Sequence, residues 1–299
     1  MNLLITGAYN CTDDDLQTLK NLNNEIVFHK MESDPLPCEY EWVEGVVCNG
    51  LFLHHDIKKF SNLKYIQLTS AGFDRVDMKY IREKGIEIHN ARGVYSVPMA
   101  EFALCGVLDL YKQSRFFYEN QKEHKWDKHR GLLEFFGKTV CIVGCGNVGL
   151  ECAKRFKAFD TTLLGVDIVK PDSDIFDNYF TLENMSSALQ VSDIVVLTLP
   201  LTDETRNMLG SETLAFFKEN AILVNISRGG VVNQADLVTA LETKKIFGAV
   251  LDVFENEPLE EKSPLWDMEN VIITPHNSFV GENNLSRLKE VVFNNLNQR

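Results

Sequence analysis

Short apolar runs alternate with amphipathic or polar stretches along almost the whole chain. Continuous apolar runs are typical of strands buried in a parallel sheet, and the stretches between them are typical of the helices that connect such strands. The first series of predicted strands covers residues 3–6, 26–29, 44–48, 65–68 and 86–89. Between them, helices or turns are predicted over residues 13–22, 56–60 and 78–84. This alternation predicts an α/β fold built on a parallel sheet.

A second series of the same kind begins at residue 139. Its predicted strands cover residues 139–143, 162–166, 194–199, 221–225, 248–251 and 271–274. Its predicted helices cover residues 148–159, 182–189, 211–217 and 234–243. Between the two series, one long helix is predicted over residues 97–118, followed by an exposed connection over 119–130, and a last helix over 283–297. A chain of 299 residues with two such series is expected to form two domains.

The charge and cysteine content exclude several classes of protein. With 43 acidic and 30 basic residues, the formal net charge is −13, which argues against a nucleic-acid-binding surface and against docking on anionic lipid. No apolar run approaches the ~20 residues that a membrane span needs. The seven cysteines include no C-x-x-C pair, so neither a zinc site nor any other metal site is expected. Together with an N-terminus that lacks a basic leader, these features predict a cytoplasmic protein.

The most specific local motif is a glycine-rich turn, Gly144-Cys145-Gly146-Asn147-Val148-Gly149, which follows a predicted strand and opens a predicted helix. In that context Gly144 would allow the tight turn and Gly146 would let the backbone approach a pyrophosphate. Gly149 would let helix and strand pack closely. The phosphates would lie at the helix N-terminus, where N–H groups and the helix dipole favour anions. The motif therefore predicts a dinucleotide site.

Asp167 ends the second strand of this series, 18 positions after Gly149 (167 − 149). An acid there accepts hydrogen bonds from the ribose hydroxyls of the adenosine and repels a 2′-phosphate, which favours NAD over NADP. The neighbouring residues Ile168 and Val169 offer no arginine to compensate. An ordinary βα turn with a surface aspartate remains the alternative at this point.

Three polar positions just past predicted strands could supply the chemistry. Arg228 could bind a substrate carboxylate through a bidentate guanidinium contact, although a surface arginine is as consistent with its spacing. His276 directly follows the last strand of the series and could act as an acid or base, held by a carboxylate partner. Candidate partners in the loop after the preceding strand are Asp252, Glu255 and Glu257, and periodicity alone does not choose between them.

Taken together, these motifs resemble the D-isomer-specific 2-hydroxyacid dehydrogenase family, which includes D-lactate, D-3-phosphoglycerate and glycerate dehydrogenases. The resemblance covers nearly the whole chain and rests on the glycine-rich turn with Asp167 and on residues 191–201, 225–232, 251–258 and 274–276. It implies two doubly wound parallel-sheet lobes. One would be a Rossmann NAD-binding domain over residues 98–278, and the other a flavodoxin-like substrate domain over residues 1–97 plus 279–299.

The resemblance also implies roles for single residues. Arg228 would orient the substrate carboxylate and carbonyl, and His276 would exchange the proton of the 2-hydroxyl group during hydride transfer. Glu257, the acid before proline, would be the partner of His276. Contacts to NAD would come from the glycine-rich turn (Gly144, Gly146, Asn147, Val148, Gly149) and from Asp167, Leu199, Pro200, Ile226, Ser227 and Asp252. The turn Ser70-Ala71-Gly72 resembles the family's substrate loop, whose backbone N–H groups bind the carboxylate.

The resemblance thus implies an NAD-dependent oxidoreductase that interconverts a D-2-hydroxy acid and its 2-oxo acid. An alternative from another class is a non-enzymatic NAD(H)-sensing scaffold with the same fold. A nearer alternative is an enzyme acting on another small anion, such as phosphite. A homodimer is expected, because the apolar residues of the long central helix, among them Phe102, Leu104, Val107 and Leu108, fit the dimers common in this family.

Overall fold

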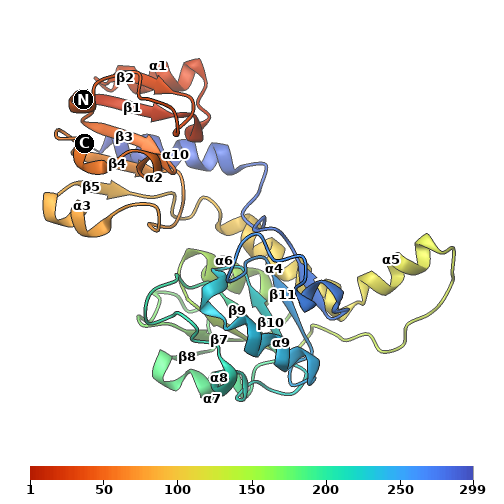
Figure 1. Cartoon of the computed structure of the whole chain (residues 1–299). Coiled ribbons are helices and arrows are strands. Elements are labelled where there is room, and N and C mark those ends of the chain that lie inside the picture. The colour runs from red at the N-terminus through yellow and green to blue at the C-terminus, as the bar shows by residue number, and fades with distance from the viewer. Residues whose placement is uncertain (299) are drawn as a thin grey trace. The chain divides into compact units, whose positions relative to one another are not determined.

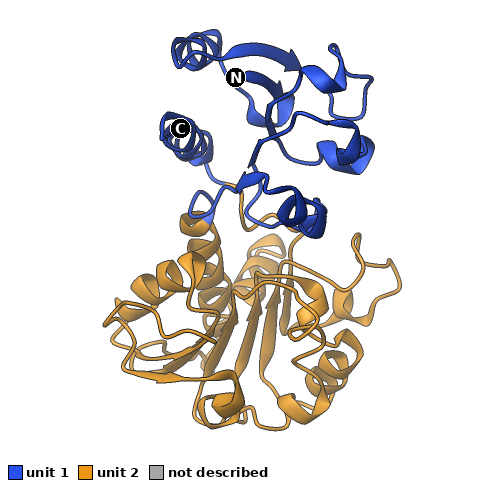
Figure 2. Cartoon of the chain, turned by 90° about the vertical axis from the view of Figure 1, so that its left-hand side faces the viewer, with its two compact units in different colours: residues 1–95, 281–299 blue, residues 96–280 orange. Residues whose placement is uncertain are grey.

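A computed structural model describes residues 1–298 of the chain. The chain divides into two compact units, which Figure 2 shows in two colours: Met1–Tyr95 with Gly281–Arg299 (unit 1), and Ser96–Val280 (unit 2). The boundaries expected from the sequence, 97/98 and 278/279, lie two residues from these divisions. Each unit has its own parallel sheet and its own buried core.

Within the described residues, the sheet of unit 1 has five strands in the order β2-β1-β3-β4-β5, and every neighbouring pair is parallel. The strands are β1 (Asn2–Thr6), β2 (Glu25–His29), β3 (Gly45–Cys48), β4 (Tyr65–Leu68) and β5 (Glu87–His89). The helices are α1 (Asp13–Asn21), α2 (Leu51–His54), α3 (Met78–Lys84) and α10 (Asn284–Asn297) (Figure 1). This strand order is flavodoxin-like.

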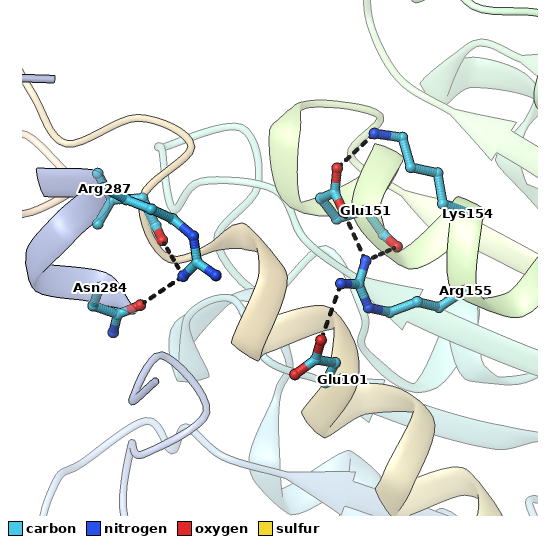
Figure 3. Close-up of polar contacts among 7 residues, drawn as sticks. Glu101, Glu151, Lys154, Arg155, Asn284 and Arg287 are labelled. Carbon is cyan, nitrogen blue, oxygen red and sulfur yellow. Dashed lines mark hydrogen bonds and ion pairs between the residues drawn. The ribbon is translucent and has the colours of Figure 1, made fainter. Parts of the chain in front are cut away.

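Helix α10 brings the end of the chain into unit 1. Its residue Val292 is fully buried in the same apolar cluster as Leu3 of β1. At the start of the helix, the Arg287 guanidinium donates to the carbonyl oxygen of Val94 at 3.4 Å and to the side-chain oxygen of Asn284 at 3.2 Å (Figure 3). The final helix therefore completes the core of the unit that the first residues begin.

The sheet of unit 2 has seven parallel strands among the described residues, in the order β12-β11-β10-β9-β6-β7-β8. The strands are β6 (Thr139–Val143), β7 (Thr162–Val166), β8 (Asn178–Phe180), β9 (Ile194–Leu197), β10 (Ile222–Asn225), β11 (Gly248–Leu251) and β12 (Val271–Ile273). The helices are α4 (Ser96–Tyr111), α5 (Ser114–Lys122), α6 (Asn147–Lys157), α7 (Met185–Leu189), α8 (Ser211–Leu214) and α9 (Gln234–Glu242). This is the Rossmann order with one added strand. The predicted fold class, two doubly wound parallel-sheet units of these two kinds, is confirmed.

The prediction of one continuous helix over residues 97–118 was wrong. The segment forms α4 and α5, separated at Gln113, whose φ of 52° is left-handed and ends regular α-helical geometry. Helix α4 packs into the core of unit 2 with Ala103 and Val107 fully buried, whereas α5 extends away from the body of the unit (Figure 1). Within residues 1–298, no helix combines the length and the apolar character that crossing a membrane requires.

Packing, more than ion pairing, joins α4 to α6. The Arg155 guanidinium of α6 lies 2.7 Å from Glu151 on its own helix and 3.1 Å from Glu101 on α4, and Lys154 lies 2.6 Å from Glu151 (Figure 3). Glu101, the partner on α4, is 62% exposed, and a pair with so exposed a partner contributes only about 0–1 kcal/mol. Apolar burial between the two helices, which share one core cluster, therefore holds α6 in place beneath the glycine-rich turn.

Apart from one-residue differences at strand ends, two strand predictions differ from the structure. Strand β8 was not predicted, because it has only three residues and is partly exposed, so its sequence has no apolar run. The predicted strand 194–199 ends at Leu197. Beyond it, the Thr198 N–H still donates to the carbonyl oxygen of Val143 at 2.9 Å, and the Thr198 hydroxyl donates to the carbonyl oxygen of Gly144 at 2.5 Å, next to the glycine-rich turn.

Candidate active site

The glycine-rich turn between β6 and α6 has the shape that a dinucleotide requires. Gly144 has a φ of 101°, and a Cβ atom there would lie 2.7 Å from the backbone nitrogen of Leu199. A Cβ atom at Gly149 would lie 2.1 Å from the carbonyl oxygen of Gly144. At Gly146, by contrast, a Cβ atom would meet nothing within 4 Å. Two glycines are thus needed for the turn itself, and the third leaves an open backbone surface that fits a pyrophosphate.

Helix α6 begins directly at this open surface. Gly146 is its N-cap and accepts the N–H of Leu150 at 2.8 Å, the first bond of the helix. The first N–H groups of a helix have no partner within it, and the helix dipole adds a partial positive charge there. Asn147 and Val148 lie in this first turn and are partly accessible. The turn can therefore bind the phosphates of a dinucleotide without any basic side chain.

Asp167 is fixed beside the turn at the end of β7. One of its carboxylate oxygens accepts the N–H of Cys145 at 2.6 Å, and the other accepts the N–H of Ile168 at 2.7 Å. The Tyr179 hydroxyl donates to its carbonyl oxygen at 2.6 Å. Asp167 remains partly accessible, so each oxygen retains lone pairs for a further hydroxyl donor. Such a carboxylate would accept ribose hydroxyls and repel a 2′-phosphate.

Cys145, between the first two glycines, takes part in this site through its backbone N–H, which binds Asp167, and not through its thiol. Its side chain is buried, with Sγ 3.7 Å from the carbonyl oxygens of Ile142 and Val166. Burial, with a smaller effect of the Asp167 charge, raises the pKa of the Cys145 thiol to about 12. A thiol with so high a pKa is not a nucleophile near neutral pH.

His276 and Glu257 meet at the carboxyl edge of the same sheet. His276 Nδ1 lies 2.8 Å from Glu257 Oε2, and the other carboxylate oxygen accepts the N–H of Phe254 at 3.1 Å. Because a carboxylate only accepts, Nδ1 carries the proton and Nε2 is the ring atom available for proton exchange. The two side chains are 41% and 37% exposed, so a ligand can reach them.

A buried aspartate holds the turn that presents His276. Asp252 is fully buried, and its carboxylate accepts the Thr274 hydroxyl at 2.7 Å, the N–H of Asn277 at 2.7 Å and the N–H of Ser278 at 2.9 Å. Its carbonyl oxygen accepts the N–H of His276 at 2.8 Å. His276 has a φ of 51°, an uncommon conformation that persists only where surrounding contacts impose it.

Arg228 lies on the next turn along the sheet, after β10. The side chain of Asn225, which is 1% exposed, shapes this turn. Its oxygen accepts the N–H of Ser227 at 3.1 Å and the Ser227 hydroxyl at 2.8 Å, and its amide donates to the carbonyl oxygen of Arg228 at 3.1 Å. The guanidinium donates to the carbonyl oxygen of Ser227 at 2.8 Å and remains partly accessible. Since β10 and β11 are neighbours, the turns bearing Arg228 and Asp252 lie at one edge.

The other predicted cofactor contacts lie on the same edge of unit 2. Leu199 and Ile226 are buried, whereas Pro200 is exposed. Ser227 is also buried and held by the Asn225 contacts described above. Of these residues, Pro200 therefore offers the most accessible surface to a ligand.

The predicted substrate loop belongs to unit 1 and follows β4. The carbonyl oxygens on either side of the turn are taken by internal donors: Ser70 O accepts the N–H of Ala91 at 2.9 Å, and Ala71 O accepts the Asn90 side-chain amide at 2.6 Å. Within residues 1–298, no acceptor contacts the N–H groups of Ala71 and Gly72. A loop whose carbonyls are paired and whose amides are open is suited to an anion.

Comparisons with known proteins agree with this geometry. The sequence model described as "D-isomer specific 2-hydroxyacid dehydrogenase, NAD binding domain" matches residues 104–278. This chain belongs to the D-isomer-specific 2-hydroxyacid dehydrogenase family. A glyoxylate reductase of Korarchaeum cryptofilum is 35% identical over 242 residues, which are 78% of this chain and 72% of that protein. A hydroxypyruvate reductase of Thermotoga maritima is 35% identical over 224 residues, 74% of this chain and 72% of that protein.

A solved structure extends the likeness to both units. The D-lactate dehydrogenase of Aquifex aeolicus, solved with NAD and lactic acid, has a TM-score of 0.79 and 25% sequence identity, covering 98% of this chain and 93% of that chain. As a D-isomer-specific 2-hydroxyacid dehydrogenase, the protein is an NAD-dependent oxidoreductase, and its cofactor is NAD(H). The open backbone at Gly146 and the fixed carboxylate of Asp167 fit that cofactor.

Two buried residues of this dehydrogenase have contacts that the sequence did not predict. Asn225 was not singled out, although a polar residue at the end of the apolar run before Arg228 was a visible signal. Asp252 was predicted as a cofactor contact and as one of three candidate carboxylate partners of His276, but not as the residue that holds the turn carrying His276, which depends on contacts across the sheet edge. Periodicity could not show either contact, because both join residues through turns that lack a repeating pattern.

Proposed function

We propose that this protein interconverts a D-2-hydroxy acid and the corresponding 2-oxo acid, with His276 and Glu257 as the acid–base pair and Arg228 orienting the substrate carboxylate. The observation that carries the proposal is the 2.8 Å hydrogen bond between His276 Nδ1 and Glu257 Oε2. It lies at the carboxyl edge of the sheet that also bears the glycine-rich turn, which is where ligands bind in open α/β sheets.

Bound NAD⁺ would accept a hydride from C2 of the hydroxy acid, and NADH would return it. His276 Nε2 would remove the proton of the 2-hydroxyl group in oxidation and deliver one to the carbonyl oxygen in reduction. Glu257 would hold Nδ1–H, keeping the ring oriented, and would stabilise the imidazolium form with its negative charge. The buried Asp252 would keep the His276 backbone in its left-handed conformation while the proton moves.

Arg228 would supply the cation that the substrate needs. Its guanidinium can bind a carboxylate through two parallel hydrogen bonds and polarise the neighbouring carbonyl group. The Asn225 contacts to Ser227 and to the Arg228 carbonyl support this role, because they fix the backbone from which the side chain starts. For the loop in unit 1, we propose that the N–H groups of Ala71 and Gly72, next to Ser70, bind the carboxylate of the same class of acid.

Small 2-oxo acids are the first substrates to test. Glyoxylate and hydroxypyruvate are named for two relatives, and lactic acid is bound in the solved D-lactate dehydrogenase. NAD would be preferred over NADP, because a 2′-phosphate would meet the Asp167 carboxylate, whose neighbours Ile168 and Val169 are exposed and uncharged. The seven free cysteines fit a reducing compartment, and a cytoplasmic location is part of the proposal.

A homodimer is also part of the proposal. Of the α4 residues expected at its contact, Val107 is fully buried in the core of unit 2, whereas Phe102, Leu104 and Leu108 are partly accessible and could contribute. More strongly exposed aromatic residues occur on α5 and after it: Tyr118 is 59%, Trp126 94% and Phe136 70% exposed. Exposed large apolar side chains are candidates for an association surface. Light scattering after gel filtration would show a dimer, and Trp126→Ala would weaken it; a monomeric wild type would contradict the proposal.

The deciding experiment follows NADH oxidation with glyoxylate, hydroxypyruvate and pyruvate in turn, and the reverse reaction with D- and L-enantiomers of the product. We expect turnover with at least one acid and selectivity for the D-enantiomer. NADH binding by fluorescence without turnover on any of the acids would contradict the proposal and favour the NAD(H)-sensing scaffold.

A further inference from the structure

Glu32, in the loop after β2 of unit 1, has its carboxylate surrounded by donors from distant parts of the chain. One oxygen accepts the Thr6 hydroxyl at 2.6 Å and the N–H of Asn49 at 2.7 Å. The other accepts the N–H of Gly50 at 2.6 Å. Three short hydrogen bonds to a partly buried carboxylate form a strong, charge-assisted cluster.

The position of this cluster in the sheet is informative. Thr6 is the last residue of β1, and Asn49 and Gly50 directly follow β3. β1 and β3 are neighbours in the order β2-β1-β3-β4-β5. From β1 the chain first adds β2 on one side and then adds β3, β4 and β5 on the other, so the point between β1 and β3 is the topological switch point of the sheet. In open α/β sheets the crevice at such a switch point is where ligands bind, and anions there are commonly held by backbone N–H groups. In unit 1, the donors at this point are already bound by a carboxylate of the chain itself, that of Glu32.

The backbone of Glu32 is anchored as firmly as its side chain. Its carbonyl oxygen accepts from His55 Nε2 at 2.9 Å, and His55 Nδ1 accepts the Tyr40 hydroxyl at 2.9 Å. Because a carbonyl oxygen only accepts, the ring proton is on Nε2, which fixes the tautomer of His55. His55 is itself buried, so the backbone of Glu32, and with it the position of the carboxylate, is held by a fixed contact.

The turn that Glu32 holds lies beside the proposed substrate loop. Cys48, the residue before Asn49, pairs with Leu68 in the ladder between β3 and β4. Its carbonyl oxygen accepts the N–H of Thr69 at 2.8 Å, and Ser70 follows immediately. A displacement of the Asn49–Gly50 turn would therefore be transmitted across one hydrogen bond to the loop whose open amides are proposed to bind the substrate.

We propose that Glu32 is a positioning residue that acts as a built-in anion. Its carboxylate binds the donors at the switch point of unit 1, holds the turn after β3 against the substrate loop after β4, and keeps external anions from these donors. This inference rests on the proposed function for its kinetic consequence. Its structural part, that the donors of Thr6, Asn49 and Gly50 form an anion site occupied from within, does not depend on catalysis.

The test compares Glu32→Ala with Glu44→Ala in the full-length protein. Glu44 is the matched control, because its carboxylate also bridges a backbone N–H (Asn2, 3.0 Å) and a second donor (Lys64, 2.9 Å), but at the opposite, amino-terminal edge of the same sheet. Loss of the Glu32 carboxylate should raise the KM for the 2-oxo acid about tenfold, with kcat less affected. The Kd for NADH, measured by fluorescence, should stay unchanged in both variants.

Acetate, which resembles the missing side-chain end, supplies the readout that separates a built-in anion from general stabilisation. Added acetate should bind Glu32→Ala in calorimetry, raise its melting temperature and lower its KM toward the wild-type value. It should do none of these in Glu44→Ala or in the wild type. An unchanged KM in folded Glu32→Ala would overturn the positioning role, and absence of acetate binding would overturn the built-in anion.

Two further experiments cover the cases in which Glu32→Ala does not fold or the wild type shows no turnover. If Glu32→Ala does not fold, Thr6→Val removes one donor while leaving the carboxylate in place, and the same KM increase is expected at smaller size; an unchanged KM would then count against the proposal. If the wild type turns over no 2-oxo acid, the proposed function fails. Acetate binding by Glu32→Ala still decides whether the donors of Thr6, Asn49 and Gly50 form an anion site.

Discussion

The backbone N–H of His276 donates a 2.8 Å hydrogen bond to the carbonyl oxygen of Asp252, across the gap between two neighbouring turns of unit 2. The Asp252 carboxylate, fully buried, accepts two more N–H groups from the same turn. The backbone N–H of Asp252 in turn donates to the carbonyl oxygen of Asn225 at 3.0 Å. A continuous path of hydrogen bonds through the buried residues Asp252 and Asn225 thus connects the turn of His276 with the turn of Arg228, which has consequences that can be measured.

Replacing either proposed reacting side chain should abolish most turnover without abolishing cofactor binding. We expect His276→Ala and Arg228→Ala each to lower kcat/KM by about 10²–10⁴-fold, because each removes a group that acts on the substrate. The Kd for NADH should remain close to that of the wild type, since the glycine-rich turn and Asp167 are untouched. His54→Ala, at an exposed histidine of unit 1, is the control. Wild-type turnover in either variant would remove that residue from the proposed mechanism.

Asn225 should matter to catalysis although it has no reactive group. Asn225→Ala removes the three side-chain hydrogen bonds that shape the turn of Arg228, so we expect kcat/KM for the 2-oxo acid to fall by about 10–100-fold. Ser192→Ala is a matched control: it also removes a buried hydrogen bond, to Ala188, but away from this edge. Steady-state kinetics and thermal melting of both variants would separate the two effects. Equal activity at equal stability would show that the Asn225 contacts do not position Arg228.

Asp167 should control the choice of cofactor. Asp167→Ala removes the carboxylate that would accept ribose hydroxyls and repel a 2′-phosphate, so the ratio of kcat/KM for NADH over NADPH should fall by at least about tenfold. Asp172→Ala, at an exposed acid in the same loop, should keep the ratio of the wild type. An unchanged ratio in Asp167→Ala would remove this residue as the determinant of specificity.

Replacing either of two glycines of the same turn by alanine should have a different effect: one substitution should lower stability, and the other should weaken NADH binding. At Gly149 a Cβ atom would lie 2.1 Å from a backbone oxygen, so Gly149→Ala should lower the free energy of unfolding by about 1–3 kcal/mol. At Gly146 a Cβ atom would meet nothing, so Gly146→Ala should leave the melting temperature unchanged while weakening NADH binding. Thermal melting and fluorescence titration measure the two effects. A Gly149→Ala variant as stable as the wild type, or a Gly146→Ala variant with the NADH affinity of the wild type, would contradict the geometry described for the glycine-rich turn.

The thiol next to the cofactor site should be inert. Burial raises the pKa of Cys145 to about 12, so at pH 8 the thiolate is a very small fraction and the side chain is covered as well. Iodoacetamide followed by mass spectrometry should leave Cys145 unmodified in the native protein and modify it after denaturation. Cys145→Ala should accordingly retain NADH affinity. Rapid alkylation of native Cys145 would show that the turn opens in solution.

Most of the secondary structure could be predicted because buried parallel strands leave long apolar runs in the sequence. The predicted strand over residues 139–143 has the same limits as β6, and apart from β8 the strands occur in the predicted order in both series, whereas helix α2 (Leu51–His54) lies before the predicted segment 56–60. The exceptions lie where the pattern is weak: β8 is short and partly exposed, and the break between α4 and α5 depends on the single left-handed residue Gln113. A conformation adopted by one residue does not change hydrophobic periodicity.

The sequence by itself determined the doubly wound fold and predicted a dinucleotide site, because both signals are local: apolar runs define strands, and glycine spacing defines the turn. It also placed His276, Arg228 and three competing acids just past strand ends. The family resemblance, but not the residue pattern, selected Glu257 as the partner of His276, and the two side chains lie 2.8 Å apart. Only the tertiary structure set Asp252 and Asn225 beneath the turns that present His276 and Arg228, and put Glu32 at the switch point of unit 1. These contacts join residues far apart in the chain through irregular turns, and their hydrogen bonds depend on distances that no periodic pattern encodes.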